Sequence, residues 1–206
     1  MLRTSHPTVA EIILDKLSLN YQETIMAAAG KQAESAAQAT IEAGNYLLLV
    51  EGAISTKDGG VYCCIGGRTA VDILEEAAAG ALAIIAVGSC AAYGGLPKAA
   101  PNPSDAVSVG ELMAAGEIAA RPLVNLPGCP PVPEVITGTV VHYITYGSAP
   151  ELDELSLERR PGDLAEELCH TTELIVGKLT GCYAISGSDF CDEEVINRKV
   201  SRLLRL

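Results

Sequence analysis

The chain has almost none of the large aromatic residues that commonly anchor a protein core. It contains no Trp and a single Phe among 206 residues, although 49% of the sequence is hydrophobic. The core therefore has to be built from aliphatic side chains, chiefly Ala, Val, Ile and Leu. A length of 206 residues fits one globular domain with room for a terminal segment.

Positive charge and long apolar runs are also scarce. The 14 Lys and Arg residues against 26 Asp and Glu residues give a net charge of −12, which argues against nucleic acid or an anionic membrane as a partner. The apolar runs are near strand length, too short to span a membrane. Glu11, Asp15 and Lys16 interrupt the first 20 residues, so we expect no signal peptide there.

Cysteine is present in an odd number. The seven cysteines cannot all pair with one another, and they are scattered through a chain that shows no secretory signal. Such a distribution favours metal binding over a disulfide framework.

Two cysteines occupy similar turns, and these turns are the most informative feature present. Cys90 lies in a Gly-Ser-Cys turn after the apolar run 83–87, and Cys129 lies in a Pro-Gly-Cys-Pro-Pro turn after the run 122–126. Each apolar run predicts a buried strand that delivers a thiolate to the edge of a sheet. The glycine in each turn lets the backbone come close to whatever the sulfur binds, and the prolines stiffen the second turn.

The two turns are 39 positions apart (129 − 90). This spacing fits a crossover with a helix between two neighbouring parallel strands. Thiolates at the carboxyl ends of adjacent parallel strands converge on one crevice, so the pattern predicts that Cys90 and Cys129 are ligands of a metal or a cluster. The alternative is that both are buried structural cysteines.

The rest of the chain alternates between strand and helix patterns. We expect strands at the end of 9–21, where Leu17, Leu19 and Tyr21 alternate, and at 46–52 as a buried strand. We expect helices within 22–43, with a break at Gly30, and at 69–79, 107–115 and 135–146. The alternation predicts an α/β fold with a mostly parallel, doubly wound sheet, ending near residue 150 where the sequence becomes acidic and polar.

Several segments together resemble the small subunit of nickel–iron hydrogenases. The segments lie at residues 2–7, 17–30, 50–54, 65–69, 88–95, 98–103 and 125–133, so the resemblance covers residues 2 to about 155. The last two of these segments also occur in the related iron–sulfur subunit of respiratory complex I, whereas segment 17–30 is typical of the hydrogenases.

The resemblance implies a flavodoxin-like iron–sulfur domain over residues 1–150 and a divergent, partly disordered region over 151–206. In the hydrogenases this domain holds the proximal [4Fe–4S] cluster beside the Ni–Fe centre of a large subunit, and the cluster exchanges electrons with an outside acceptor protein or cofactor. Two ligands come from an N-terminal Cys-x-x-Cys turn, and Cys90 and Cys129 match the other two. The resemblance therefore implies cluster ligation by these two cysteines, and no catalytic residue in this chain.

The sequence departs from the hydrogenase pattern at both ends. The Cys-x-x-Cys turn would precede the segment that here follows Met1 directly, so the ligand set in the printed sequence is incomplete. Cys169 and His170 are adjacent, whereas two residues separate the corresponding His and Cys of the hydrogenase C-terminal domain. An export signal would also precede the missing turn; we expect a cytoplasmic location, with a periplasmic one as the alternative.

Other candidate residues each have a plain structural explanation. Cys63 and Cys64 are adjacent and point to opposite sides of an extended chain, so packing is favoured over a compensating ligand role. Glu51 either relays protons at the end of its strand or caps loop amides, and Arg68 orients a loop or forms a surface ion pair. His6 and His142 are expected to be structural. Four further residues are either a metal site or incidental groups in a poorly folded tail: Cys169, His170, Cys182 and Cys191.

Three functions remain open at this point. The first is an electron-transfer subunit of a hydrogenase, which is not catalytic alone because it lacks the paired Cys-x-x-Cys motifs that bind the Ni–Fe centre. The second is a non-redox α/β assembly module that keeps the large-subunit interface without a cluster. The third, a flavin or nucleotide binder, ranks lowest because no phosphate-cradling loop is present.

Overall fold

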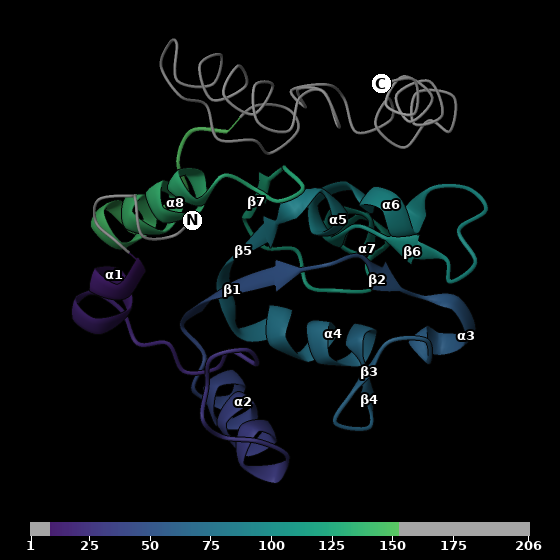
Figure 1. Ribbon diagram of the computed structural model, residues 1–206, viewed down its shortest axis with the longest axis horizontal. Coiled ribbons are helices and arrows are strands. Elements are labelled where there is room, and N and C mark those ends of the chain that lie inside the picture. The colour runs from purple at the N-terminus through teal and green to yellow at the C-terminus, as the bar shows by residue number, and fades with distance from the viewer. Residues whose placement is uncertain (1–8, 153–206) are drawn as a thin grey trace, which may run out of the picture.

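The computed structural model of the protein describes residues 9–152, and its centre is a parallel sheet of three strands (Figure 1). Val87 pairs with Glu51 on one side and with Leu126 on the other, so all three strands end at the same edge of the sheet. The strands, in their spatial order, are β1 (Tyr46–Glu51), β5 (Ala81–Val87) and β7 (Leu123–Leu126).

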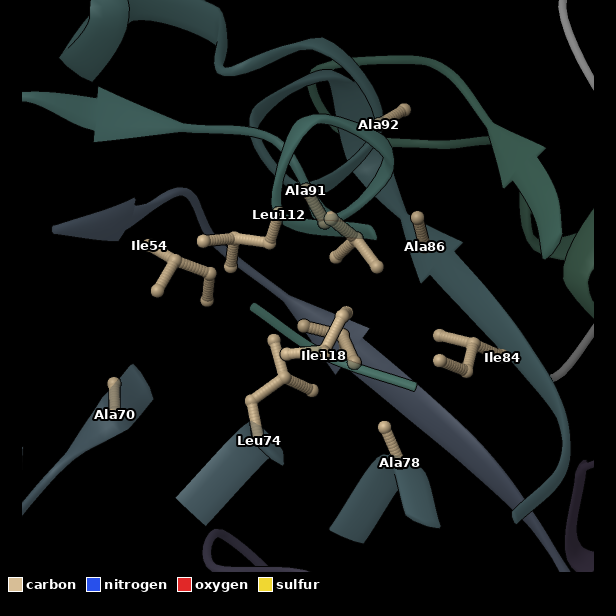
Figure 2. Packing of buried hydrophobic residues seen from close by; sticks show 12 residues of the cluster. Ile54, Ala70, Leu74, Ala78, Ile84, Ala86, Ala91, Ala92, Leu112 and Ile118 are labelled. Atoms are coloured by element: carbon tan, nitrogen blue, oxygen red, sulfur yellow. The ribbon is translucent and has the colours of Figure 1, made fainter. Parts of the chain in front are cut away.

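One face of the sheet packs against helices α4 (Ala70–Gly80), α5 (Gly88–Tyr93) and α7 (Val109–Ala115). Figure 2 shows Leu74 of α4 and Leu112 of α7 in the cluster that contains Ile84 of β5. Burying one such side chain contributes about 1.5–3 kcal/mol. The small alanines of the helices and of β5 let these elements approach closely, as the aliphatic composition requires.

The opposite face packs against α1 (Val9–Asp15) and α8 (Pro133–Tyr146). Ile12 of α1 and Val140 of α8 are buried in a second cluster with Ile85, Val124 and Leu126 of the sheet. Helices therefore cover both faces, and the doubly wound α/β class expected from the sequence is confirmed.

Local sequence signals explain where several helices begin. Thr69 precedes α4, and its Oγ1 accepts a hydrogen bond from the Asp72 amide at 3.2 Å. Helix α2 (Lys31–Ala43) begins directly after Gly30, whereas residues 22–29, which were also expected to be helical, form turns and a bend instead. Pro133 opens α8, where its missing N–H costs no helical hydrogen bond.

Short elements complete the described chain. The described chain also has two small antiparallel strand pairs outside the main sheet and two single-turn helices. They are β2 (Ile54–Ser55) with β6 (Ala106–Val107), β3 (Cys64–Ile65) with β4 (Arg68–Thr69), α3 (Lys57–Gly60) and α6 (Gly95–Lys98).

Two expectations about strands are corrected by the structure. The expected strand at Leu17, Leu19 and Tyr21 is wrong, because α1 ends at Asp15 and the following residues pair with no strand among residues 9–152. The strand at 46–52 exists as β1 but is not buried throughout: Leu49 is 48% exposed because β1 lies at the end of the sheet.

The remaining expectations about the whole chain lie partly outside the described residues. The domain boundary near residue 150 and the region 151–206 stay predictions, since residues 153–206 are not described. Among residues 9–152, no helix is both long and apolar enough to cross a membrane.

Candidate cysteine site at the edge of the sheet

Cys90 lies in the first turns of α5, directly after β5. The chain turns from strand to helix at Gly88, whose φ of +84° favours glycine, and a Cβ there would lie 3.4 Å from the Gly128 carbonyl oxygen. The sequence predicted a thiolate delivered by a strand end; the structure adds a short helix that holds Cys90 half-buried.

Cys129 follows β7 and is exposed. The preceding Gly128 has a φ of +128°, and a Cβ at this residue would lie 2.6 Å from Pro131 Cα. Gly128 and Pro131 also form an isolated antiparallel bridge that closes the turn. The turn thus requires glycine at position 128 for steric reasons, and it presents the Cys129 thiol outward.

Two hydrogen bonds join the cysteine turns. The Ser89 amide donates to the Gly128 carbonyl at 3.0 Å, and the Gly128 amide donates to Ser89 Oγ, also at 3.0 Å. Ser89 is only 5% exposed, so these bonds are shielded from water. The prediction that both turns lie at the same edge of the sheet is confirmed; we call this region, with Cys90 and Cys129, the cysteine edge.

The cysteine edge disfavours a thiolate at Cys90. Burial raises the pKa of the Cys90 thiol most, a hydrogen bond from the Leu96 amide lowers it, and the charges of Cys129 and Glu51 raise it further. Glu51 ends β1, and the two cysteines follow the ends of β5 and β7, so the three groups lie at one edge of the main sheet. A cation at the edge would reverse this balance by stabilising the thiolates.

The space next to the Cys90 sulfur has room only for a glycine at position 95. A Cβ added at Gly95 would lie 2.6 Å from Cys90 Sγ, so only glycine leaves the sulfur its position. Ser89, Gly95 and Leu96 were not predicted as site residues, although the first two lie in the segment 88–95 that carries the resemblance. The Leu96 contact uses a backbone amide, which no side-chain pattern reveals.

The ligand set for a four-iron cluster is not complete within residues 9–152. A [4Fe–4S] cluster takes four thiolates, and the cysteine edge offers two. Within the described part of the chain, no group of three or more His, Cys, Asp and Glu residues is placed to hold a metal ion. These residues alone therefore do not fit the whole cluster.

The other candidate residues lie away from this group or outside the described range. Cys63 packs against the core, which agrees with a packing role, whereas Cys64 is exposed and its Sγ donates to the Val61 carbonyl at 3.4 Å. Arg68 forms an ion pair with Glu76 at 2.6 Å. The His142 ring lies on Tyr146, with ring centroids 4.6 Å apart. His6, Cys169, His170, Cys182 and Cys191 lie outside the described residues.

Comparison with known proteins gives a consistent result. Residues 1–143 match the family described as NADH ubiquinone oxidoreductase, 20 Kd subunit. The chain is 43% identical over 175 residues to the hydrogenase-2 small chain of Escherichia coli K12, covering 82% of this chain and 45% of that one. It is 45% identical over 170 residues to the periplasmic [NiFe] hydrogenase small subunit of Solidesulfovibrio fructosivorans, covering 82% and 51%.

The fold agrees with a solved structure. The Ni-Fe-Se hydrogenase from Desulfomicrobium baculatum superposes with a TM-score of 0.70 at 38% identity, over 74% of this chain and 61% of that one. The chain spans about half the length of the curated relatives it matches.

Proposed function

The chain belongs to the family described as NADH ubiquinone oxidoreductase, 20 Kd subunit, and is related within it to the small subunits of nickel–iron hydrogenases; on this basis we propose that it is the electron-transfer small subunit of such a hydrogenase. The observation that carries the proposal is the convergence of Cys90 and Cys129 at the cysteine edge, through the two hydrogen bonds between Ser89 and Gly128.

The proposed cofactor is a [4Fe–4S] cluster, and Cys90 and Cys129 would supply two of its four thiolates. Such a cluster would supply one-electron transfer when bound. The chain's own residues would bind it and shield it: the Leu96 amide donates to Cys90 Sγ, and Gly95 leaves room for the sulfur. Because the described ligand set is half complete, we derive no electron path through it.

The proposed partners are a large subunit that carries the Ni–Fe centre and an electron acceptor protein or cofactor. We also propose a cytoplasmic location, or a periplasmic one if an export signal precedes the printed sequence. The chain would not oxidise hydrogen by itself, since no Cys-x-x-Cys motif of the kind that binds the Ni–Fe centre occurs among its seven cysteines.

Co-expression with the cognate hydrogenase large subunit tests the proposal. The tagged chain should retain the large subunit during anaerobic purification, and the complex should contain iron–sulfur cluster and reduce a viologen dye with hydrogen. Cys90→Ser and Cys129→Ser should each lower cluster content and dye reduction at least tenfold while the subunits stay associated. Cys64→Ser, which changes an exposed thiol outside the cysteine edge, is the matched control. Failure to bind the large subunit would contradict the proposal.

A second function is favoured by one observation. Within residues 9–152, the cysteine edge has only two thiols, which is fewer than a four-iron cluster needs. This number would also be expected of a non-redox assembly module that binds the large subunit without a cluster. A stable complex without cluster at the cysteine edge, unaffected by both serine substitutions, would support this alternative over electron transfer.

A further inference from the structure

We propose that a cleft beside helix α2 binds an aliphatic ammonium or guanidinium group, a function that lies outside the cysteine edge and goes beyond electron transfer. The cleft lies between α2, α4, the β3–β4 hairpin and segment 21–23, and its volume is about 390 Å³. Figure 1 shows α2 and the hairpin both below α4. A cleft of this size is large enough for a small organic group. We call it the α2 cleft.

Part of the α2 cleft is apolar. Ile41 of α2, Ile65 of β3 and Ile73 of α4 all line it. None of the three isoleucines is fully buried, so each leaves hydrocarbon surface accessible. An alkyl chain placed against this surface would remove apolar area of both partners from water, which favours a ligand with an apolar stem.

The polar part of the α2 cleft carries negative charge. The carboxyl group of half-buried Glu34 lies against Gly66 in the hairpin turn, where an added Cβ would meet Glu34 Cδ at 2.7 Å and its two oxygens at 2.8 and 2.9 Å. Exposed Glu23 lines the same cleft. In the part of the chain that the structure describes, neither carboxylate forms an ion pair with a basic side chain.

The charges of both carboxylates reach Tyr21, which also lines the α2 cleft. Burial raises the pKa of the Tyr21 hydroxyl most, and the charges of Glu23 and Glu34 raise it further. The three groups therefore share one region of negative potential. A cation bound in this region would be attracted by both carboxylates.

The basic residue in the lining is engaged elsewhere. Arg68 donates to Glu76 Oε2 at 2.6 Å, and Glu76 Oε1 accepts from Gln38 Nε2 at 3.0 Å. These bonds hold the Arg68 guanidinium on Glu76 rather than on Glu34. An incoming cation would consequently meet carboxylates that no side chain among residues 9–152 neutralises by an ion pair.

An alkyl chain that ends in a cation matches both parts of the α2 cleft. Its stem would pack on the isoleucines, and its ammonium or guanidinium group would donate hydrogen bonds to the carboxylates. Such a group has two sources of the same chemistry: a free aliphatic amine, or a Lys or Arg side chain of a partner subunit.

Titration of the purified full-length chain with n-butylammonium, followed by ligand-observed NMR, tests the inference. We expect saturable binding, and 1-butanol, which has a similar stem without the charge, should bind about tenfold more weakly. Glu34→Gln should weaken butylammonium binding by about tenfold as well. Glu75→Gln, which changes an exposed carboxylate of α4 outside the α2 cleft, is the matched control and should leave the binding unchanged. Urea unfolding verifies that both variants are folded.

The complex with a large subunit distinguishes the two sources. If butylammonium no longer binds once the complex has formed, the partner fills the α2 cleft; if it still binds, the ligand is a free amine. Equal binding of butylammonium and 1-butanol, unchanged binding by Glu34→Gln, or no saturable binding to the lone chain would each overturn the inference. None of these three results bears on cluster binding or on association with the large subunit, which the co-expression experiment measures separately.

Discussion

A side chain added at Gly95 would overlap with Cys90. Gly95 has a φ of +55°, and an added Cβ would lie 2.6 Å from Cys90 Sγ and 2.9 Å from Cys90 Cα. The second of these atoms belongs to the backbone of α5, which cannot rotate away as a flexible side chain can. Any larger residue must therefore either displace Cys90 or distort the turn.

The substitution Gly95→Ala should lower the free energy of unfolding by about 2–4 kcal/mol, because backbone strain and steric overlap add. Urea unfolding measures the change. Gly116→Ala is the matched control: Gly116 also has a positive φ of +75°, but a Cβ there meets nothing within 4 Å. The control should lose only about 1–2 kcal/mol from strain. Equal losses in the two variants would show that the contact with Cys90 is not tight.

The sequence predicted site residues correctly where the side chain itself indicates the chemistry, as it does for a cysteine. The positions of Cys90 and Cys129 followed from apolar runs that end in glycine. The groups that fix them in place are different in kind: a serine hydroxyl bound to the amide of a residue 39 positions away, and the backbone amide of Leu96. Contacts of this kind depend on how distant segments meet, and no local pattern records them.

At the level of elements, α7 has the best-defined start. Ser108 Oγ accepts from the Glu111 amide at 3.2 Å, and Glu111 Oε2 accepts from the Ser108 amide at 2.9 Å, which forms a capping box. Ser108 is 4% exposed. Because Leu112 of this helix belongs to the core, the capping box helps to hold the packing beneath the sheet.

Ser108→Ala should therefore lower the free energy of unfolding by about 1 kcal/mol, the usual cost of losing an N-cap. Thermal or urea unfolding measures it. Ser35→Ala provides the comparison, because Ser35 is exposed on α2 and donates only to the Lys31 carbonyl. That variant should be neutral within about 0.5 kcal/mol. A loss confined to Ser35→Ala would contradict the role given to the cap.

Glu111 also makes the stability depend on pH. Burial works to raise the pKa of its carboxyl, but hydrogen bonds from Lys98 and Ser108 outweigh burial and hold the pKa below its ordinary value of 4.5. The contact between Lys98 Nζ and Glu111 Oε1 is 2.5 Å. Because the pKa is lowered in the folded state, the contribution is fully present above the ordinary pKa and is lost as the pH falls through the folded pKa.

At neutral pH, the variant Glu111→Gln should therefore have a lower free energy of unfolding than the native protein. The expected loss is about 0.5–1 kcal/mol, because the Lys98–Glu111 pair is partly exposed. The difference should shrink below about pH 4.5. Urea unfolding across this range gives both values. Glu75→Gln, which changes an exposed carboxylate on α4, is the control. A difference that grows as the pH falls would refute the assignment.

The elements themselves were predicted unevenly. Long periodic segments with clear ends, such as α4 after Thr69 and α8 from Pro133, appear within two residues of where the sequence placed them. The alternation at Leu17, Leu19 and Tyr21 predicted a strand that does not form. An alternating segment becomes a strand only where it can pair with a neighbouring strand. Strands of only two residues, such as β2 and β6, are too short to show any alternation of apolar and polar residues in the sequence.

At the scale of the whole molecule, the chain should show no hydrogen oxidation alone. The purified chain, before and after reconstitution with iron and sulfide, should give no hydrogen-dependent reduction of a viologen dye above the buffer rate. Addition of electrons by dithionite is the positive control for the dye. Hydrogen uptake by the lone chain, free of any large subunit, would require an activating centre within it and would overturn this expectation.

The position of β1 has a practical consequence for any such experiment. Within residues 9–152, the outer backbone of β1 pairs with no further strand, and Leu49 on it is 48% exposed. Unpaired strand edges are templates for chain-to-chain strand addition. Concentrated samples are therefore expected to form oligomers of open-ended size, independent of iron. A charged residue at Leu49, such as Leu49→Lys, should suppress this aggregation.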